Sequence, residues 1–153
     1  MRRRPIACLL LAIVMPSATL AASDTLFDRY KAASLTAAGK MMDYYETCAP
    51  GIAEKVPAIS YNAPMDEATA CVIDSYADQM GDEAAEELVV EVETWAAGEI
   101  ATVDDLQLKG KHAMSPELQG IVQACGVVEA SADNPSTKAI MENVEMLAPC
   151  FNQ

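Results

Sequence analysis

Apolar residues recur every three or four positions between residues 24 and 48, which is the spacing of one face of an α-helix. Asp24 precedes this pattern as an N-cap candidate, and Pro50 with Gly51 ends it. We therefore predict a helix over residues 24–48, with Cys48 on its buried face. That face consists of Leu26, Tyr30, Ala33, Ala37, Met41, Tyr44 and Cys48.

Prolines interrupt the pattern over residues 49–64, and we expect an ordered loop there with a short turn at residues 52–55. The helical period resumes at Met65 and keeps its phase as far as Trp95, although Gly81 interrupts it. A glycine inside a helix costs only about 1 kcal/mol. The unbroken phase therefore favours one long or bent helix, while two helices that separate at Gly81 are the alternative.

Two more helices are predicted in the last third of the chain. Ser115 followed by Pro116 is a typical helix start, with a hydroxyl N-cap and proline at the first helical position. Ser136 can cap the last helix, and Pro149 ends it. The apolar positions of the earlier helix are Leu118, Ile121, Val122, Cys125 and Val128, and those of the last helix are Ile140, Val144 and Leu147.

No segment alternates apolar and polar residues in the manner of a half-buried strand. The predicted fold class is therefore all-α: a small, disulfide-stapled bundle of four helices, or five if the chain breaks at Gly81.

The first 22 residues show the three parts of a secretory signal peptide. Arginines at positions 2–4 precede an apolar run over residues 6–15, and small residues follow over residues 17–23. The apolar run is too short to cross a bilayer, which takes roughly 20 apolar residues. We expect residues 1–22 to be removed and residues 23–153 to form a single helical domain in the periplasm or outside the cell. An uncleaved N-terminal anchor is the alternative.

The export signal changes the interpretation of the five cysteines, because Cys8 lies within it. The other four, in an oxidising compartment, predict two disulfides. Sequence alone allows three pairings, and we favour Cys48–Cys71, which closes the loop between consecutive helices, together with Cys125–Cys150. The second pairing has less support, since these two positions diverge in a simple helical hairpin.

Net charge narrows the choice of partner. Removal of three arginines leaves 10 − 3 = 7 basic residues against 23 acidic ones, so the predicted mature charge is 7 − 23 = −16. Such a chain is repelled by nucleic acids and by anionic membranes. The charge favours a basic protein partner or cations.

Catalytic and cofactor signatures are lacking in this sequence. His112 is the single histidine, and its position beside Gly110 and two lysines suggests an exposed loop residue. No Cys-x-x-Cys motif or glycine-rich phosphate loop is present. We therefore expect no enzyme activity, no cofactor and no resident metal.

An acidic run is the most distinctive feature after the signal peptide. It consists of Asp82, Glu83, Glu86, Glu87, Glu91 and Glu93. On a helix its i, i+4 spacings place like charges next to one another, which is unfavourable by a few tenths of a kcal/mol per pair. A solvated face, a surface for a basic partner and a cation site are the three interpretations.

Together these features suggest a small exported, non-enzymatic module that binds another protein. It would act as an inhibitor or immunity factor against a basic exported protein, or as a stress-protective protein whose packing loosens when its carboxylates are protonated. The alternative is a periplasmic carrier of a ligand or metal ion on the acidic helix face. The residues expected to contact a partner are Asp82, Glu83, Glu86, Glu87 and Glu91.

Overall fold

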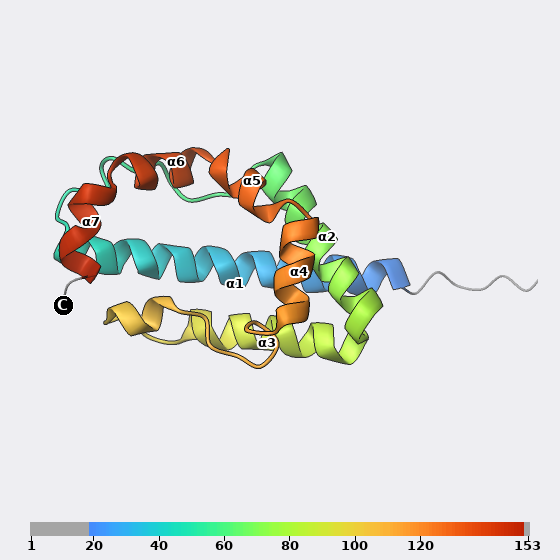
Figure 1. Ribbon diagram of the computed structural model, residues 1–153. Coiled ribbons are helices and arrows are strands. Elements are labelled where there is room, and N and C mark those ends of the chain that lie inside the picture. Colours follow the sequence, from blue (N-terminus) through green and yellow to red (C-terminus); the bar gives the residue numbers. More distant parts are fainter. Residues whose placement is uncertain (1–18, 152–153) are drawn as a thin grey trace, which may run out of the picture.

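Helix α1 (Thr19–Cys48) is the longest element, about 45 Å over its 30 residues, and it spans most of the length of the molecule (Figure 1). The computed structural model describes residues 19–151, with side chains from Thr25 onward. Residues 1–18, most of the predicted signal peptide, lie outside the described residues. Helix α1 begins at Thr19, so Asp24 lies inside the helix and is not its N-cap.

The described residues are all-α, as predicted, and contain no strand. They form more helices than the four or five expected, because the chain bends at Gly81, after Cys125 and at Asn143. The elements after α1 are α2 (Ala63–Met80), α3 (Asp82–Ala97), the 3₁₀ helix η1 (Val103–Leu106), α4 (Pro116–Ala124), α5 (Val127–Ala132), α6 (Pro135–Glu142) and α7 (Val144–Phe151).

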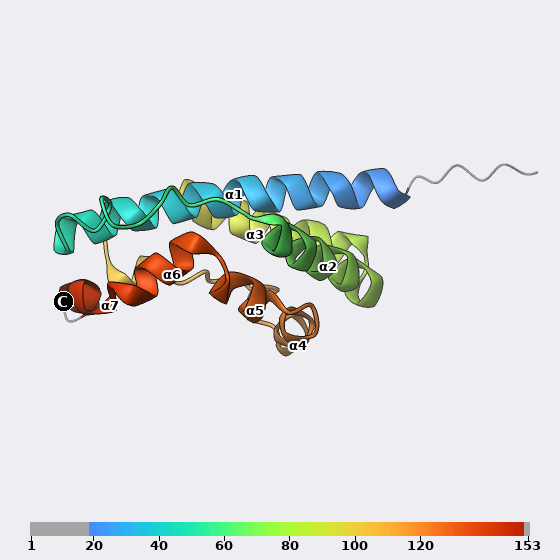
Figure 2. The ribbon, with the colours of Figure 1, turned by 90° about the horizontal axis from the view of Figure 1, so that it is seen from above.

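Helices α1 and α3 run side by side in the same direction (Figures 1 and 2). Their contact is lined by small side chains, which let the two backbones approach closely: the buried residues there are Ala33, Ala37, Val92 and Ala96. Tyr30, Trp95 and Leu108 pack around this cluster. The parallel course requires the chain to return along the molecule between the two helices, and the loop after α1 together with α2 makes that return.

Gly81 separates α2 from α3, so the favoured prediction of one continuous helix is wrong. Its backbone has φ 95° and ψ 158°, a conformation that is almost confined to glycine. The N–H of Gly81 still donates to the carbonyl oxygen of Ala77 at 2.8 Å, which closes α2. The hydrophobic period keeps its phase across the turn because both helices bury their apolar faces in the same core, as Val72, Tyr76 and Leu88 show.

Helices α4 to α7 form a C-terminal arm, residues 116–151, which returns along α1 to its C-terminal end (Figure 2). Ser115 caps α4 as predicted and accepts from the N–H of Leu118 at 3.2 Å. The predicted third helix breaks after Cys125, where Gly126 is left-handed with φ 69°. Val128, expected in the core, is therefore exposed.

The last helix of the sequence also differs from the prediction. Asn134, and not Ser136, is the N-cap of α6, and its side chain accepts from the Ser136 N–H at 3.0 Å. Pro149 lies inside α7. A proline removes one hydrogen bond from a helix, and here the fully buried Cys150 on the next position holds the final turn against α1. Val144, another predicted core residue, is exposed.

Two disulfides attach the C-terminal arm to the helices before it. Cys48 at the end of α1 pairs with Cys150 of α7, and Cys71 of α2 pairs with Cys125 after α4, over Cα–Cα distances of 5.2 and 5.7 Å. All four predicted cysteines are thus bridged, but both favoured pairings are wrong. The loop after α1 carries the chain away from Cys48 before Cys71 is reached, and the returning arm brings a different cysteine to each.

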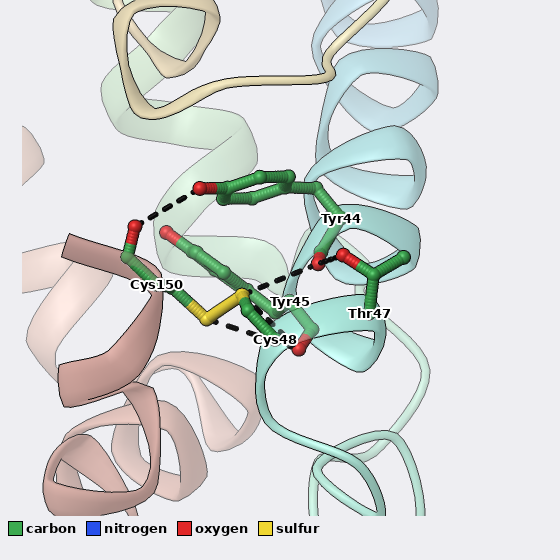
Figure 3. Close-up of a disulfide and its surroundings, with 5 residues drawn as sticks. All are labelled: Tyr44, Tyr45, Thr47, Cys48 and Cys150. Atoms are coloured by element: carbon green, nitrogen blue, oxygen red, sulfur yellow. Dashed lines mark hydrogen bonds between the residues drawn. A yellow bond between two sulfur atoms is a disulfide. The ribbon is translucent and has the colours of Figure 1, made fainter. Parts of the chain in front are cut away.

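The Cys48–Cys150 bridge lies in a tyrosine-lined site (Figure 3). The hydroxyl of Tyr44 donates to the carbonyl oxygen of Cys150 at 2.9 Å in a buried position. The ring of Tyr45 lies beside the bridge and at 6.1 Å from that of Phe151. Cys150 is fully buried in this packing, and Cys48 is half-buried.

The loop over residues 49–62 is ordered. Its predicted turn at residues 52–55 is present, because the Lys55 N–H donates to the carbonyl oxygen of Ile52 at 3.0 Å. Ile52 is fully buried. Glu46 accepts from the backbone N–H groups of Gly51 and Ala53, and these bonds hold the pKa of its carboxyl below the ordinary value. The Asn134 side chain donates to Ser60, which fixes the far end of the loop to the arm.

We predict that mild reductant opens Cys71–Cys125 before Cys48–Cys150. Cys71 is exposed, whereas Cys150 is fully buried, and thiol–disulfide exchange requires access to a sulfur. Timed reduction, alkylation and peptide mass spectrometry would measure the order. Earlier alkylation of Cys48 and Cys150 would contradict this assignment.

We also predict that Gly81→Ala lowers the free energy of unfolding by about 1–3 kcal/mol, because a Cβ is strained in this conformation. Gly39→Ala is the matched control: Gly39 lies in α1, nothing surrounds its Cβ position, and alanine there should add up to about 1 kcal/mol. Urea unfolding followed by circular dichroism measures both. Equal effects of the two variants would show that the Gly81 backbone is not strained for alanine.

Candidate functional site

The acidic run lies on helix α3, and its side chains face three different environments. Glu86 and Glu93 lie toward α1, Glu87 and Glu91 lie toward the segment before α4, and the remaining two carboxylates are at the exposed start of the helix. The predicted partner-contacting residues therefore do not form one free acidic face.

Arg29 of α1 binds the first pair. Its Nη1 lies 2.6 Å from Glu86, while Nε and Nη2 lie 2.9 and 2.7 Å from the two oxygens of Glu93. This two-pronged contact holds the pKa of the Glu93 carboxyl below its ordinary value, and the two carboxylates raise the pKa of the Arg29 guanidinium. The ion pairs fix the register of α3 on α1, since an arginine fork matches a carboxylate in only a few geometries.

Lys40 extends the same contact to the end of α3. Its ammonium lies 2.6 and 2.7 Å from the carbonyl oxygens of Ala96 and Gly98. These carbonyls are at the C-terminal end of the helix, where the helix dipole favours a cation. Both ends of the α1–α3 interface are thus held by a basic side chain of α1.

The second acidic pair binds residues 107–115, which we name the strap. Glu91 accepts from the backbone N–H groups of His112, at 3.1 Å to each oxygen, and Ala113, at 2.9 Å. Gly110 lies so close that a Cβ there would overlap the Glu91 carboxylate. A side chain at position 110 would therefore displace the Glu91 carboxylate from the strap.

His112 is buried, with 7% of its surface exposed, so the expectation of an exposed loop histidine is wrong. Its Nε2 lies 2.6 Å from Glu87, and its Nδ1 lies 2.8 Å from the hydroxyl of the fully buried Tyr76. An ionised carboxylate can only accept, so Nε2 donates, and in the neutral ring Nδ1 accepts from the tyrosine. Both ring nitrogens have partners.

Two shallow recesses flank this contact and share Val90 and Glu91. One, of about 360 Å³, includes Trp95 and η1; the other, of about 290 Å³, includes His112 and Lys111. Trp95 donates through Nε1 to the Asp105 carbonyl at 2.9 Å. Hydrogen bonds from Thr102 and from the backbone of Ala101 hold the pKa of the Asp105 carboxyl below its ordinary value.

Neither recess contains the parts of a nucleophilic site, because His112 faces Tyr76 and Glu87, not a serine or cysteine. Among the residues that the structure describes, no group of three or more histidine, cysteine or acidic side chains is arranged to hold a metal ion. Among the described residues, the two carboxylates of this site bind backbone N–H groups of the strap and the buried imidazole of His112.

Several other acidic side chains have no ion pair or side-chain hydrogen bond to described residues, and five of them lie on α2 and at the start of α3. On the exposed face of α2, Glu67, Asp74 and Asp78 follow helical spacing, and Asp82 and Glu83 lie at the exposed start of α3, directly after the turn at Gly81. We name these residues, all exposed, the acidic stripe: Glu67, Asp74, Asp78, Asp82 and Glu83.

Sequence reasoning missed the partners of the acidic run. Arg29 is the first basic residue of the predicted mature chain and lies within a helix. Its i, i+7 pair of glutamates, 86 and 93, was a detectable signal, because that spacing places both on one face of α3. Nothing local in the sequence connects Tyr76 or Glu91 to His112.

Comparison with protein-family models, curated proteins and solved structures finds no match to this chain. Within residues 19–151, no helix combines the length and apolar character needed to cross a membrane.

Replacing Arg29 tests whether its ion pairs stabilise the fold. Glu93 has a lowered pKa in the folded protein, so its contribution is present at neutral pH and is lost as the pH falls through the folded pKa. We expect Arg29→Gln to lower the melting temperature near pH 7, and the difference from wild type to shrink below about pH 4. Calorimetry across this range measures it. A difference independent of pH would exclude the Glu93 pairing as its source.

Proposed function

We propose that this protein is an exported, non-enzymatic binding module whose acidic stripe recognises a basic protein. The observation that carries the proposal is the distribution of charge: the glutamates at 86, 87, 91 and 93 are bound by other parts of the molecule, while the five carboxylates of the stripe are exposed and have no ion pair or side-chain hydrogen bond among the described residues. Export is supported by the two disulfides and by the features of residues 1–22.

The stripe has a shape suited to this role. Its α2 portion extends about 17 Å along a single helix face, and the turn at Gly81 places Asp82 and Glu83 at its end. Met80 lies at the same turn with 43% of its surface exposed. A flexible apolar side chain beside carboxylates resembles the combination of apolar contact and charged rim that protein interfaces use.

Opposite charge accelerates association more than it strengthens the final complex. A mature charge near −16 would therefore favour rapid capture of a basic enzyme or toxin, as an inhibitor or immunity factor requires. Metal-ion carriage is the alternative, but the helix face that suggested it is occupied by Arg29, His112 and the strap. Support for carriage is correspondingly weaker.

The proposal predicts that neutralising the stripe slows partner capture. The test variant carries Asp74→Asn, Asp78→Asn, Asp82→Asn and Glu83→Gln. A control with the same charge change at the opposite end of α1 carries Asp43→Asn, Glu54→Gln, Glu142→Gln and Glu145→Gln, at positions that are also exposed. Immobilised wild type would first select partners from an extract of exported proteins at low salt, for identification by mass spectrometry.

Association rates of the identified partner then decide the outcome. We expect the stripe variant to associate about tenfold or more slowly than wild type at low ionic strength, with the difference diminishing as salt rises, and the control to remain near wild type. Equal slowing by both variants would indicate a general effect of net charge. Unchanged association of the stripe variant would rule out the stripe as the binding surface.

A further inference from the structure

We propose that the strap, residues 107–115, is an acid-sensitive cover that opens at low pH and exposes apolar surface of the core. This goes beyond the proposed binding of a basic protein and does not depend on the acidic stripe. It supplies a structural route for the stress-protective interpretation, in which acid exposes apolar surface that can bind apolar segments of other proteins.

The strap is attached to α3 mainly through carboxylates. Glu91 receives both consecutive backbone N–H groups at 112 and 113, and Glu87 receives the His112 ring. Hydrogen bonds to an ionised acceptor are about twice as strong as neutral ones. Protonation of these two carboxylates therefore weakens three attachments of the strap at once.

His112 gives a second reason why the closed strap becomes less stable in acid. An imidazolium is well accommodated while Glu87 is ionised, because Nε2–H faces a carboxylate and Nδ1–H can donate to the Tyr76 hydroxyl. When Glu87 is neutral, the same buried cation lies between a hydroxyl and an uncharged carboxyl. A buried charge without a counter-ion is costly, so the ring favours leaving the site.

The other charged groups around these residues either have a partner of opposite charge or also weaken the attachment of the strap in acid. Arg29 pairs with Glu86 on the α1 side of α3. Lys109 and Lys111 on the strap keep their charge in acid, while the surrounding carboxylates lose theirs, so attraction between strap and helix declines. The titratable groups nearest the contact are Tyr76 on α2, Glu86, Glu87 and Glu91 on α3, and Glu99, Asp104 and Asp105 at the far end of the larger recess.

The strap covers core residues in two places. Leu108 packs on the α1–α3 cluster with Val92, and Ala113 packs on the cluster that includes Tyr76 and Leu88. Movement of the strap would uncover the intervening face of α3. The Cys71–Cys125 bridge holds the start of the arm on α2, so the strap can open while the remaining helices stay assembled.

Amide hydrogen exchange of the full predicted mature chain, with its disulfides intact, tests this directly. When the pH of wild type is lowered from about 7 to about 3, we expect protection of the strap amides, relative to unstructured rates, to fall roughly tenfold or more, while α1 keeps its protection. Binding of the apolar dye anilinonaphthalene sulfonate should rise over the same range.

The double variant Glu87→Gln and Glu91→Gln should show this opened state already near pH 7, with little further change in acid. Glu142→Gln, at an exposed position on α6 outside both the strap and the stripe, is the control, and its strap protection should match that of wild type. If the double variant fails to fold, Gly110→Ala provides a second route, because its Cβ displaces the Glu91 carboxylate without changing any charge. It should open the strap at neutral pH.

Two results would overturn the proposal. One is a wild-type strap that stays as protected as α1 near pH 3. The other is loss of protection in the strap and in α1 together, which would show that acid unfolds the whole chain and not the strap. Loss of stripe-dependent partner binding would leave this inference intact, since the stripe is on α2 and at the start of α3.

Discussion

The parallel packing of α3 on α1 is the contact on which the other features depend. Small residues, such as Ala37 and Ala96, allow the two helices to approach, and Arg29 and Lys40 hold the two ends of the contact. With one face of α3 fixed in this way, its acidic residues are directed to both sides. The carboxylates on one side of α3 pair with Arg29 of α1, and those on the other side bind the strap.

Most acidic side chains of α3 therefore stabilise the fold through contacts with other segments, whereas those of the stripe on α2 are exposed on the surface. Like-charged rows on an isolated helix are mutually repulsive, but Glu87 and Glu91 each have a donor that outweighs that repulsion. The buried His112 ring, in turn, joins α2, α3 and the strap through two hydrogen bonds. A local pattern that suggests solvent exposure can thus belong to a buried polar network.

The disulfides show where prediction from sequence fails. The residues that bridge were predictable from their even number after the predicted export signal, and the all-α class was predictable from helical periodicity. The pairing of the cysteines was not predictable, because it depends on the path of the C-terminal arm. The arm bends at Gly126 and Asn143, and its last helix, α7, brings Cys150 to Cys48. The prediction of a continuous helix across Gly81 failed for a related reason. The hydrophobic pattern shows which side of a helix faces the core, and it does not change at a turn that keeps the same side buried.

By itself, the sequence determined what local physics controls: the all-α class, the N-cap at Ser115, the turn after Ile52, the bridged cysteines and the large negative charge. Tertiary structure alone decided which cysteines meet, which carboxylates are occupied and why His112 is buried. The physical reason is separation along the chain. Caps and periodicity act over a few residues, whereas Arg29 and Glu93, or Tyr76 and His112, become neighbours only when distant helices pack.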